Sequence, residues 1–180
     1  MNELQDAWLD AWRFAARAHG AQATPGEPFP YLMHLGAVGM EVLVAHQISP
    51  FDDPILAIQC ALLHDTLEDT ATREEGLVSR FGPRVAAGVR ALAKDASLPT
   101  KAEKMADSLA RIRVQPREVW AVKLADRITN LAPPPYTWSA EKIVTYREES
   151  RLILAALGEA HGPLAERLAS RIEAYPPVDR

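Results

Sequence analysis

The stretch Ile55–Leu63 restricts the fold more than any other, because Gln59 is its only polar residue. An apolar run of this length predicts a helix buried in the core of a folded domain and ending near its last leucine. Ionisable side chains follow at once, at His64, Asp65, Glu68 and Asp69. On a continuous helix, residues four apart are neighbours, so these side chains would form two adjacent pairs.

This cluster has the chemistry of a metal-dependent hydrolytic site. Imidazole and carboxylate groups are ligands for hard-to-borderline divalent ions. Nearby carboxylates can also manage the protons of a water molecule that such an ion activates. The sequence therefore predicts that the rest of the chain completes and supplies a site at the end of the buried helix.

Hydrophobic residues make up 48% of the 180 residues, which is enough for one core, and strand-like alternation is nearly absent. We therefore expect an all-α fold of about eight to ten helices, in a single domain over residues 1–180. Residues 21–31 contain three prolines and a glycine, which indicates a loop that could form a lid or pocket wall. The expected helices are 2–20, 32–47, 54–64, a short one capped by residues 70–72, 83–94, 100–112, 118–131, 138–157 and 160–173. For the helix over 54–64, Asp53 is the expected cap and Pro54 the first residue.

Charge and composition exclude several classes of protein. The net charge of −4 argues against nucleic acid as the main partner. No uncharged stretch reaches the ~20 residues that span a bilayer, and the acidic N-terminus does not resemble a secretory signal. Cys60 is the only cysteine and lies within the apolar run, so no intrachain disulfide can form. A cytoplasmic protein is expected, and its oligomeric state is left open.

A second apolar helix, expected over 118–131, also carries a polar stripe. Lys123, Asp126, Arg127 and Asn130 share one face at spacings of three and four. Such a stripe is costly to bury without partners. Asp126 could form an internal ion pair with a neighbouring cation. Alternatively, the two apolar helices could pack together and bring Asp126 into a pocket with the histidine and aspartate of the first cluster.

Two blocks of the sequence, residues 62–70 (LLHDTLEDT) and 122–131 (VKLADRITNL), resemble the hydrolase domain of RelA/SpoT proteins. These proteins belong to the metal-dependent HD phosphohydrolases. Because the chain is short, it is most similar to the stand-alone small alarmone hydrolases of the metazoan SpoT-homologue type. The resemblance covers roughly residues 8–157, and the helix expected over 160–173 would pack on that domain.

The resemblance implies an enzyme that uses Mn²⁺ to remove pyrophosphate from the 3′ position of an alarmone nucleotide of the ppGpp or ppApp type. It implies that the metal ligands are His34, His64, Asp65 and Asp126. It also implies that Glu68 and Asp69 handle the attacking water. For substrate binding, the resemblance places Asn130 at a position that contacts the nucleotide and Tyr146 at a matching place on the next helix. The pyrophosphate also needs cations, and those available in the sequence are Lys123, Arg127, Lys101, Lys104 and Lys142.

The chain departs from its relatives at positions that bear on the nucleobase. The loop Ala21–Gly26 has no lysine or arginine where the family is basic. Leu35 replaces the proline that usually follows the first metal histidine, and the segment 130–138 is also different. Guanine and adenine therefore both remain candidates. Two further functions stay open as well: an HD phosphatase acting on another nucleotide or on the 2′-phosphate of NADPH, and a non-catalytic nucleotide sensor, although Glu68 and Asp69 argue against a sensor.

Overall fold

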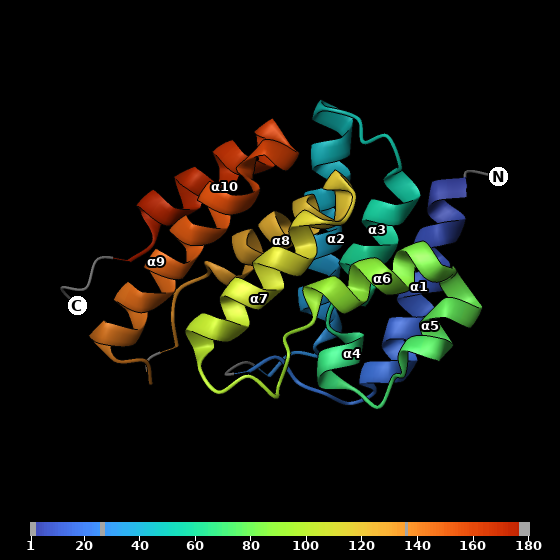
Figure 1. Cartoon of the computed structure of the whole chain (residues 1–180), viewed down its shortest axis with the longest axis horizontal. Coiled ribbons are helices and arrows are strands. Elements are labelled where there is room, and N and C mark those ends of the chain that lie inside the picture. The colour runs from blue at the N-terminus through green and yellow to red at the C-terminus, as the bar shows by residue number, and fades with distance from the viewer. Residues whose placement is uncertain (1–2, 26–27, 136, 177–180) are drawn as a thin grey trace.

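The computed structural model describes residues 3–25, 28–135 and 137–176. Over these residues the chain folds into ten α-helices and one 3₁₀ turn, and its only β pairing is an isolated bridge between Ala23 and Pro30 (Figure 1). The prediction of an all-α fold is thereby confirmed. No helix in these parts of the chain is both long and apolar enough to cross a membrane.

The helices follow the predicted order along the chain. They are α1 (Glu3–His19), α2 (Leu32–Ile48), α3 (Pro54–Leu63), α4 (Thr66–Asp69), α5 (Glu74–Phe81), α6 (Pro83–Leu92), α7 (Lys101–Arg113), α8 (Arg117–Asn130), α9 (Ala140–Leu157), η1 (Gly158–Ala160) and α10 (Gly162–Ala174).

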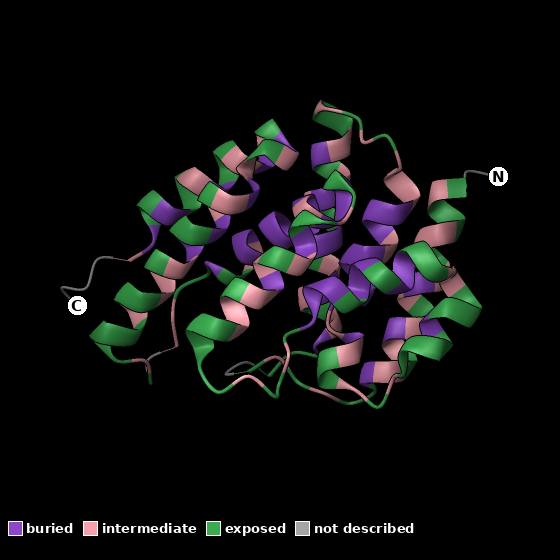
Figure 2. Cartoon of the chain, in the orientation of Figure 1, coloured by how far each residue is buried: buried purple, intermediate pink, exposed green. Residues whose placement is uncertain are grey.

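The apolar helix α3 lies at the centre of the fold, in contact with α1, α2, α6 and α8. Its side chains from Leu56 to Leu63 are buried, with Gln59 as the partial exception, and α8 is buried from Glu118 to Ile128 with only Trp120 partly exposed. Figure 2 shows this contrast with the outer helices, which alternate between buried and exposed residues. Helices α9 and α10 pack on α8 from the side away from α1. The two sequence stretches with polar ends are therefore neighbours in the core.

Local sequence signals fix several helix ends. The Asp53 carboxylate accepts a hydrogen bond from the Leu56 amide at 3.0 Å, and Pro54 occupies the first turn, as predicted. Helix α1 ends before Gly20, whose φ of +53° suits glycine. A capping box formed by Thr100 and Glu103 starts α7.

Helix α3 stops at Leu63, within one residue of its predicted end, and a separate short α4 follows. Polar side chains end α3 by bonding its last carbonyls, since His64 Nδ1 lies 2.8 Å from Ala61 O and Thr66 Oγ1 donates to Leu63 O at 2.7 Å. The four ionisable groups therefore do not share one continuous helix, as their pairing at helical spacing had assumed.

Two helix ends were placed wrongly. Helix α6 ends at Leu92, so Lys94 lies beyond it, although the predicted helix ran to residue 94. The short helix α5 has Arg73 at its N-cap position with no side-chain cap, because the Thr70 and Thr72 hydroxyls bond each other at 2.8 Å instead.

Candidate metal centre

Three separate segments bring four potential ligands together. His34 lies in the first turn of α2, His64 and Asp65 form the break between α3 and α4, and Asp126 lies in the buried part of α8. His34 Nε2 is 3.3 Å from His64 Nε2 and 3.5 Å from Asp126 Oδ1. His64 Nε2 is 2.9 Å from Asp65 Oδ2 and 3.7 Å from Asp126 Oδ1.

These separations fit the edges of a metal coordination shell. Ligand atoms around one divalent ion lie roughly 3.0–3.5 Å apart, because each sits about 2.1 Å from the ion. His34, His64 and Asp126 form a group whose ligand atoms all lie within 4.8 Å of one another. Asp65, the fourth predicted ligand, is not part of this group, although its Oδ2 lies 3.7 Å from His34 Nε2 and accepts a hydrogen bond from the Tyr31 hydroxyl. Two imidazoles and carboxylate oxygens suit Mn²⁺, Fe²⁺ or Zn²⁺ alike.

Surrounding groups orient the ligands. Because a carbonyl oxygen can only accept, the contact between His64 Nδ1 and Ala61 O requires the proton on Nδ1 and points Nε2 into the cluster. Asp126 accepts from Lys123 Nζ at 2.9 Å and from Asn130 Nδ2 at 2.5 Å. The internal ion pair considered from the sequence is therefore present, and Asp126 still faces both imidazoles.

The electrostatics of the cluster are those of a closely packed set of opposite charges. Burial lowers the pKa of His64, but the carboxylates of Asp65 and Asp126 outweigh burial and raise it to about 9. Burial would likewise raise the pKa of Asp126, yet Lys123 and the two imidazoles hold it well below its usual value. Without an ion, the cluster therefore carries carboxylates balanced by protonated groups.

Glu68 and Asp69, the expected water-handling pair, both lie on α4 and line the pocket over the cluster. Both oxygens of Glu68 contact Lys94, one its Nζ and one its backbone amide, each at 2.9 Å. Burial and the neighbouring carboxylates Asp65 and Glu68 raise the pKa of Asp69, against a hydrogen bond from Gln22. The two carboxylates thus have different environments.

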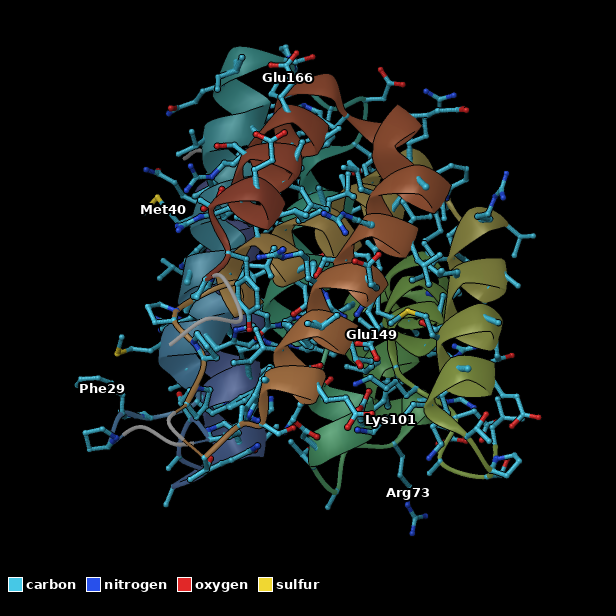
Figure 3. The ribbon with its side chains drawn as sticks, turned by 90° about the vertical axis from the view of Figure 1, so that its left-hand side faces the viewer. Phe29, Met40, Arg73, Lys101, Glu149 and Glu166 are labelled. Carbon is cyan, nitrogen blue, oxygen red and sulfur yellow. The ribbon has the colours of Figure 1, made fainter. Side chains whose placement is uncertain are left out.

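The pocket has a volume of about 360 Å³ and is strongly ionic. Figure 3 shows Lys101 and Glu149, which reach it from α7 and α9, on the side of the molecule away from Phe29 and Met40. Lys104, expected to bind substrate, is absent from the described residues that line it, and Lys101, one turn earlier, lines it instead. The cations in its wall are Lys94, Lys101, Lys123, Arg127 and Lys142.

Arg127 and Tyr146 line the pocket and pack against each other. The Arg127 side chain is 7% exposed, its guanidinium carbon lies 4.2 Å from the centre of the Tyr146 ring, and its Nη1 is 3.8 Å from Glu149 Oε2. Lys142 Nζ lies 4.0 Å from the centre of the Trp138 ring. Trp138 and Lys94 are pocket residues that the sequence did not indicate, since neither lies in a recognisable pattern.

A second cavity of about 660 Å³ adjoins the first, and His34, Asn130, Trp138 and Tyr146 line both. Its wall comes from the loop at Thr24–Pro25 and Phe29, from α2, and from the segment that follows α8. Among the described residues that line it, none is Asp, Glu, Lys or Arg. We call it the uncharged annex. The prediction that loop 21–31 forms a pocket wall agrees with this position, except that residues 26–27 lie outside the described residues.

Comparison with known proteins places this arrangement among relatives. A zebrafish (Danio rerio) protein named guanosine-3′,5′-bis(diphosphate) 3′-pyrophosphohydrolase MESH1 is 34% identical over 89% of both chains. The human protein of the same name is 32% identical over the same shares. An Aquifex aeolicus pyrophosphohydrolase is 33% identical over 88% of this chain but only 21% of its own length.

The fold agrees with these matches. A solved structure of a metazoan orthologue of SpoT, described as hydrolysing ppGpp, superimposes with a TM-score of 0.80 at 25% identity and covers 93% of this chain and 94% of its own. The HD domain family matches residues 11–164. The cluster of histidines and aspartates between α2, α3 and α8 is thus set in a chain that belongs to the HD domain family and is homologous to its MESH1/SpoT-type members.

Proposed function

We propose that the chain is a cytoplasmic Mn²⁺-dependent hydrolase that removes pyrophosphate from the 3′ position of an alarmone nucleotide, ppGpp or ppApp. The observation that carries the proposal is that the cluster of His34, His64, Asp65 and Asp126 lies against a pocket whose described wall residues include five cations. The relatives that share 30–34% identity over about nine-tenths of the chain and bear the name of this activity add support.

The four ligands would hold the ion, which supplies Lewis acidity toward a phosphoryl oxygen and toward water. The two aspartates and two neutral imidazoles suit Mn²⁺, a relatively hard ion that accepts oxygen and nitrogen ligands. The tautomer set by Ala61 O leaves His64 Nε2 free to bind. Lys123 and Asn130 fix the orientation of Asp126.

Glu68 and Asp69 would position the attacking water and accept its proton. Both line the pocket beside the cluster, and burial together with the neighbouring carboxylates raises the pKa of Asp69, which makes it a better proton acceptor than an ordinary aspartate. Glu68 is already bound by Lys94 and would act chiefly by orienting the water. This division of roles assigns metal binding and water handling to different carboxylates.

The pyrophosphate group would bind the pocket cations. Lys101 and Lys142 are exposed and can follow a mobile phosphate, whereas Lys123 and Arg127 are buried and act from fixed positions. Charge-assisted hydrogen bonds of this kind are short and about twice as strong as neutral ones. They would hold the group and stabilise charge that builds on it during hydrolysis.

The uncharged annex would receive the nucleoside, and this supports ppApp beside ppGpp. Pro133, Pro134 and Pro135 line it and offer no N–H donors toward the O6 and N7 acceptors of guanine. One of the two N–H donors of the Asn130 side-chain amide is already engaged by Asp126. Because discrimination between bases needs placed hydrogen bonds, we expect stacking on Trp138 and Tyr146 with little preference for either purine.

A release assay tests the proposal directly. Purified protein is depleted of metal, reloaded with Mn²⁺, and given ppGpp, ppApp or NADPH in parallel. We expect pyrophosphate from both alarmones, and no turnover when a chelator is present. Release of orthophosphate would favour an HD phosphatase, including one that acts on NADPH. Tight binding of an alarmone without turnover would favour a sensing module and contradict the enzyme.

A further inference from the structure

The contact between Lys94 and Glu68 is a double one. The Lys94 ammonium lies 2.9 Å from Glu68 Oε1, and the Lys94 backbone amide donates to Glu68 Oε2 at 2.9 Å. Both carboxylate oxygens are therefore engaged. Although burial opposes the positive charge, Glu68 raises the pKa of Lys94 above its ordinary value, so the ammonium stays protonated. This pairing joins α4 to the segment after α6, 26 residues away in sequence.

The segment that carries Lys94 is itself held by Arg111. Helix α6 ends at Leu92 and leaves carbonyls without helical partners. Arg111 Nη1 donates to Arg90 O at 2.6 Å and to Ala91 O at 2.9 Å, and its Nη2 donates to Ala93 O at 2.8 Å. A cation at the negative end of a helix is favourable. These bonds fix the peptide group between Ala93 and Lys94, whose N–H donates to Glu68.

A carboxylate holds Arg111 in turn. Asp107, one turn earlier on α7, lies 2.8 Å from Arg111 Nε and 2.7 Å from its Nη2. The guanidinium therefore binds Asp107 through Nε and Nη2 and the carbonyls at the end of α6 through Nη1 and Nη2. The result is a continuous series of contacts from α7 through the end of α6 to Glu68.

We propose that Arg111 and Lys94 are positioning residues that hold the Glu68 carboxylate in the orientation it needs to handle water. The inference rests on the proposed function, which gives Glu68 that role. Helix α4 is only four residues long, so it offers little support to the side chain by itself. A misplacement of about 1 Å in a reacting group can cost on the order of 100-fold in rate, so this support has a kinetic consequence.

The rival interpretation is that Lys94 binds the pyrophosphate directly, as the other pocket cations are expected to do. The two interpretations differ in what a variant changes. A positioning residue acts through Glu68, so its removal lowers kcat and leaves KM nearly unchanged. A substrate ligand raises KM, and its effect adds to the effect of losing Glu68.

The test is a set of mutant cycles on Mn²⁺-loaded protein with ppGpp and ppApp. We expect Lys94→Met to lower kcat by roughly 10–100-fold, with full metal content and little change in KM. Arg111→Met should lower kcat in the same direction by a smaller factor, because the ammonium and the amide remain. In a Glu68→Gln background, neither change should lower kcat further. Arg113→Met, an exposed change two residues along α7, is the matched control and should leave kcat unchanged.

A second measurement does not depend on turnover. The ¹⁵N-resolved NMR signal of the Lys94 ammonium persists where an ion pair slows its exchange with water. We expect this signal in the wild type, its loss in Glu68→Gln, and its weakening in Arg111→Met but not in Arg113→Met. If the wild type hydrolyses no alarmone, the proposed function fails, and the NMR series still decides the positioning contacts. Three results would overturn the inference. They are additive effects on KM, an unchanged kcat in Lys94→Met, and an ammonium signal that is the same in Glu68→Gln as in the wild type.

Discussion

Gly88 lies where α6 packs on α3 and α8, the two helices that lead into the metal cluster. A methyl group added there would lie 2.7 Å from Cys60 Sγ and 3.0 Å from Val119 Cγ2. Favourable non-bonded contacts lie at about 3.5–4.0 Å, so the neighbours would have to move by up to about 1 Å. We therefore predict that Gly88→Ala destabilises the protein, although alanine is the better helix former.

The expected magnitude follows from two opposing terms. Overpacking a close-packed core costs about 1–3 kcal/mol, and replacing glycine by alanine inside a helix returns about 0.5–1 kcal/mol. The net loss is about 1–2 kcal/mol, which for a chain of this length lowers Tm by roughly 2–8 °C. Gly76 in α5 is the matched control, because a methyl group there meets nothing within 4 Å. Gly76→Ala should raise stability by about 0.5–1 kcal/mol.

The assay is thermal and urea unfolding in the presence of a chelator, so that metal binding does not add to the stability of either variant. A second variant locates the clash: Cys60→Ala removes the sulphur that the new methyl group would meet. The double variant Gly88→Ala/Cys60→Ala should then be more stable than the two single losses add up to, by about 1 kcal/mol. Equal gains in stability for Gly88→Ala and Gly76→Ala would show that α3 and α6 are not packed this closely and refute the reasoning.

Four more predictions concern the site and its core. Asp65→Ala should lose metal and activity together, whereas Glu68→Ala should keep metal and lose turnover. Elemental analysis and an assay of pyrophosphate release on both variants check this. Equal metal loss in the two variants would contradict the proposed division of roles. The pKa of His64 is about 9, and the imidazole must lose its proton to bind an ion. The affinity for Mn²⁺ should therefore fall about tenfold per pH unit from pH ~9 down to pH 6. A calorimetric titration that finds no such slope would contradict this prediction. Burial raises the pKa of Cys60 to about 12, so iodoacetamide at pH 8 should label only the unfolded protein. For the same reason the free energy of unfolding should decrease between pH 9 and pH 12, where only the unfolded thiol ionises.

The core and the order of the helices could be predicted from the sequence because they follow from local patterns. Ile55–Leu63 is apolar apart from Gln59, which indicated a central helix, and Asp53 with Pro54 marked its start. The end of this helix near Leu63 could be predicted from the end of the apolar run, but the conformation of the break that follows could not. That conformation depends on hydrogen bonds from the His64 and Thr66 side chains to nearby backbone carbonyls, and helical spacing does not predict such bonds.

The site was only partly predictable, for a related reason. His64 and Asp65 stand out locally, but His34 was identified by resemblance alone, since its contact with His64 spans 30 residues. The pairing of Lys94 with Glu68 gave no signal, because it depends on how α4 and the end of α6 come together. Lys104 was expected at the substrate because it is one of the cations available in the sequence to bind a pyrophosphate. The lining face of α7 instead runs through Lys101, Met105 and Ser108.

Because the charges of the cluster are balanced, binding of a metal ion would change the net charge of the buried wall of the pocket. Without an ion, two carboxylates face one protonated imidazole and the Lys123 ammonium, so their charges sum to zero. A divalent ion that displaces the His64 proton leaves one net positive charge in the same volume. The loaded protein would then attract a polyanion that the unloaded protein attracts only through the surrounding lysines. If the proposed function holds, nucleotide binding would then strengthen with metal loading, so that the protein would bind its substrate most tightly in the form that can cleave it.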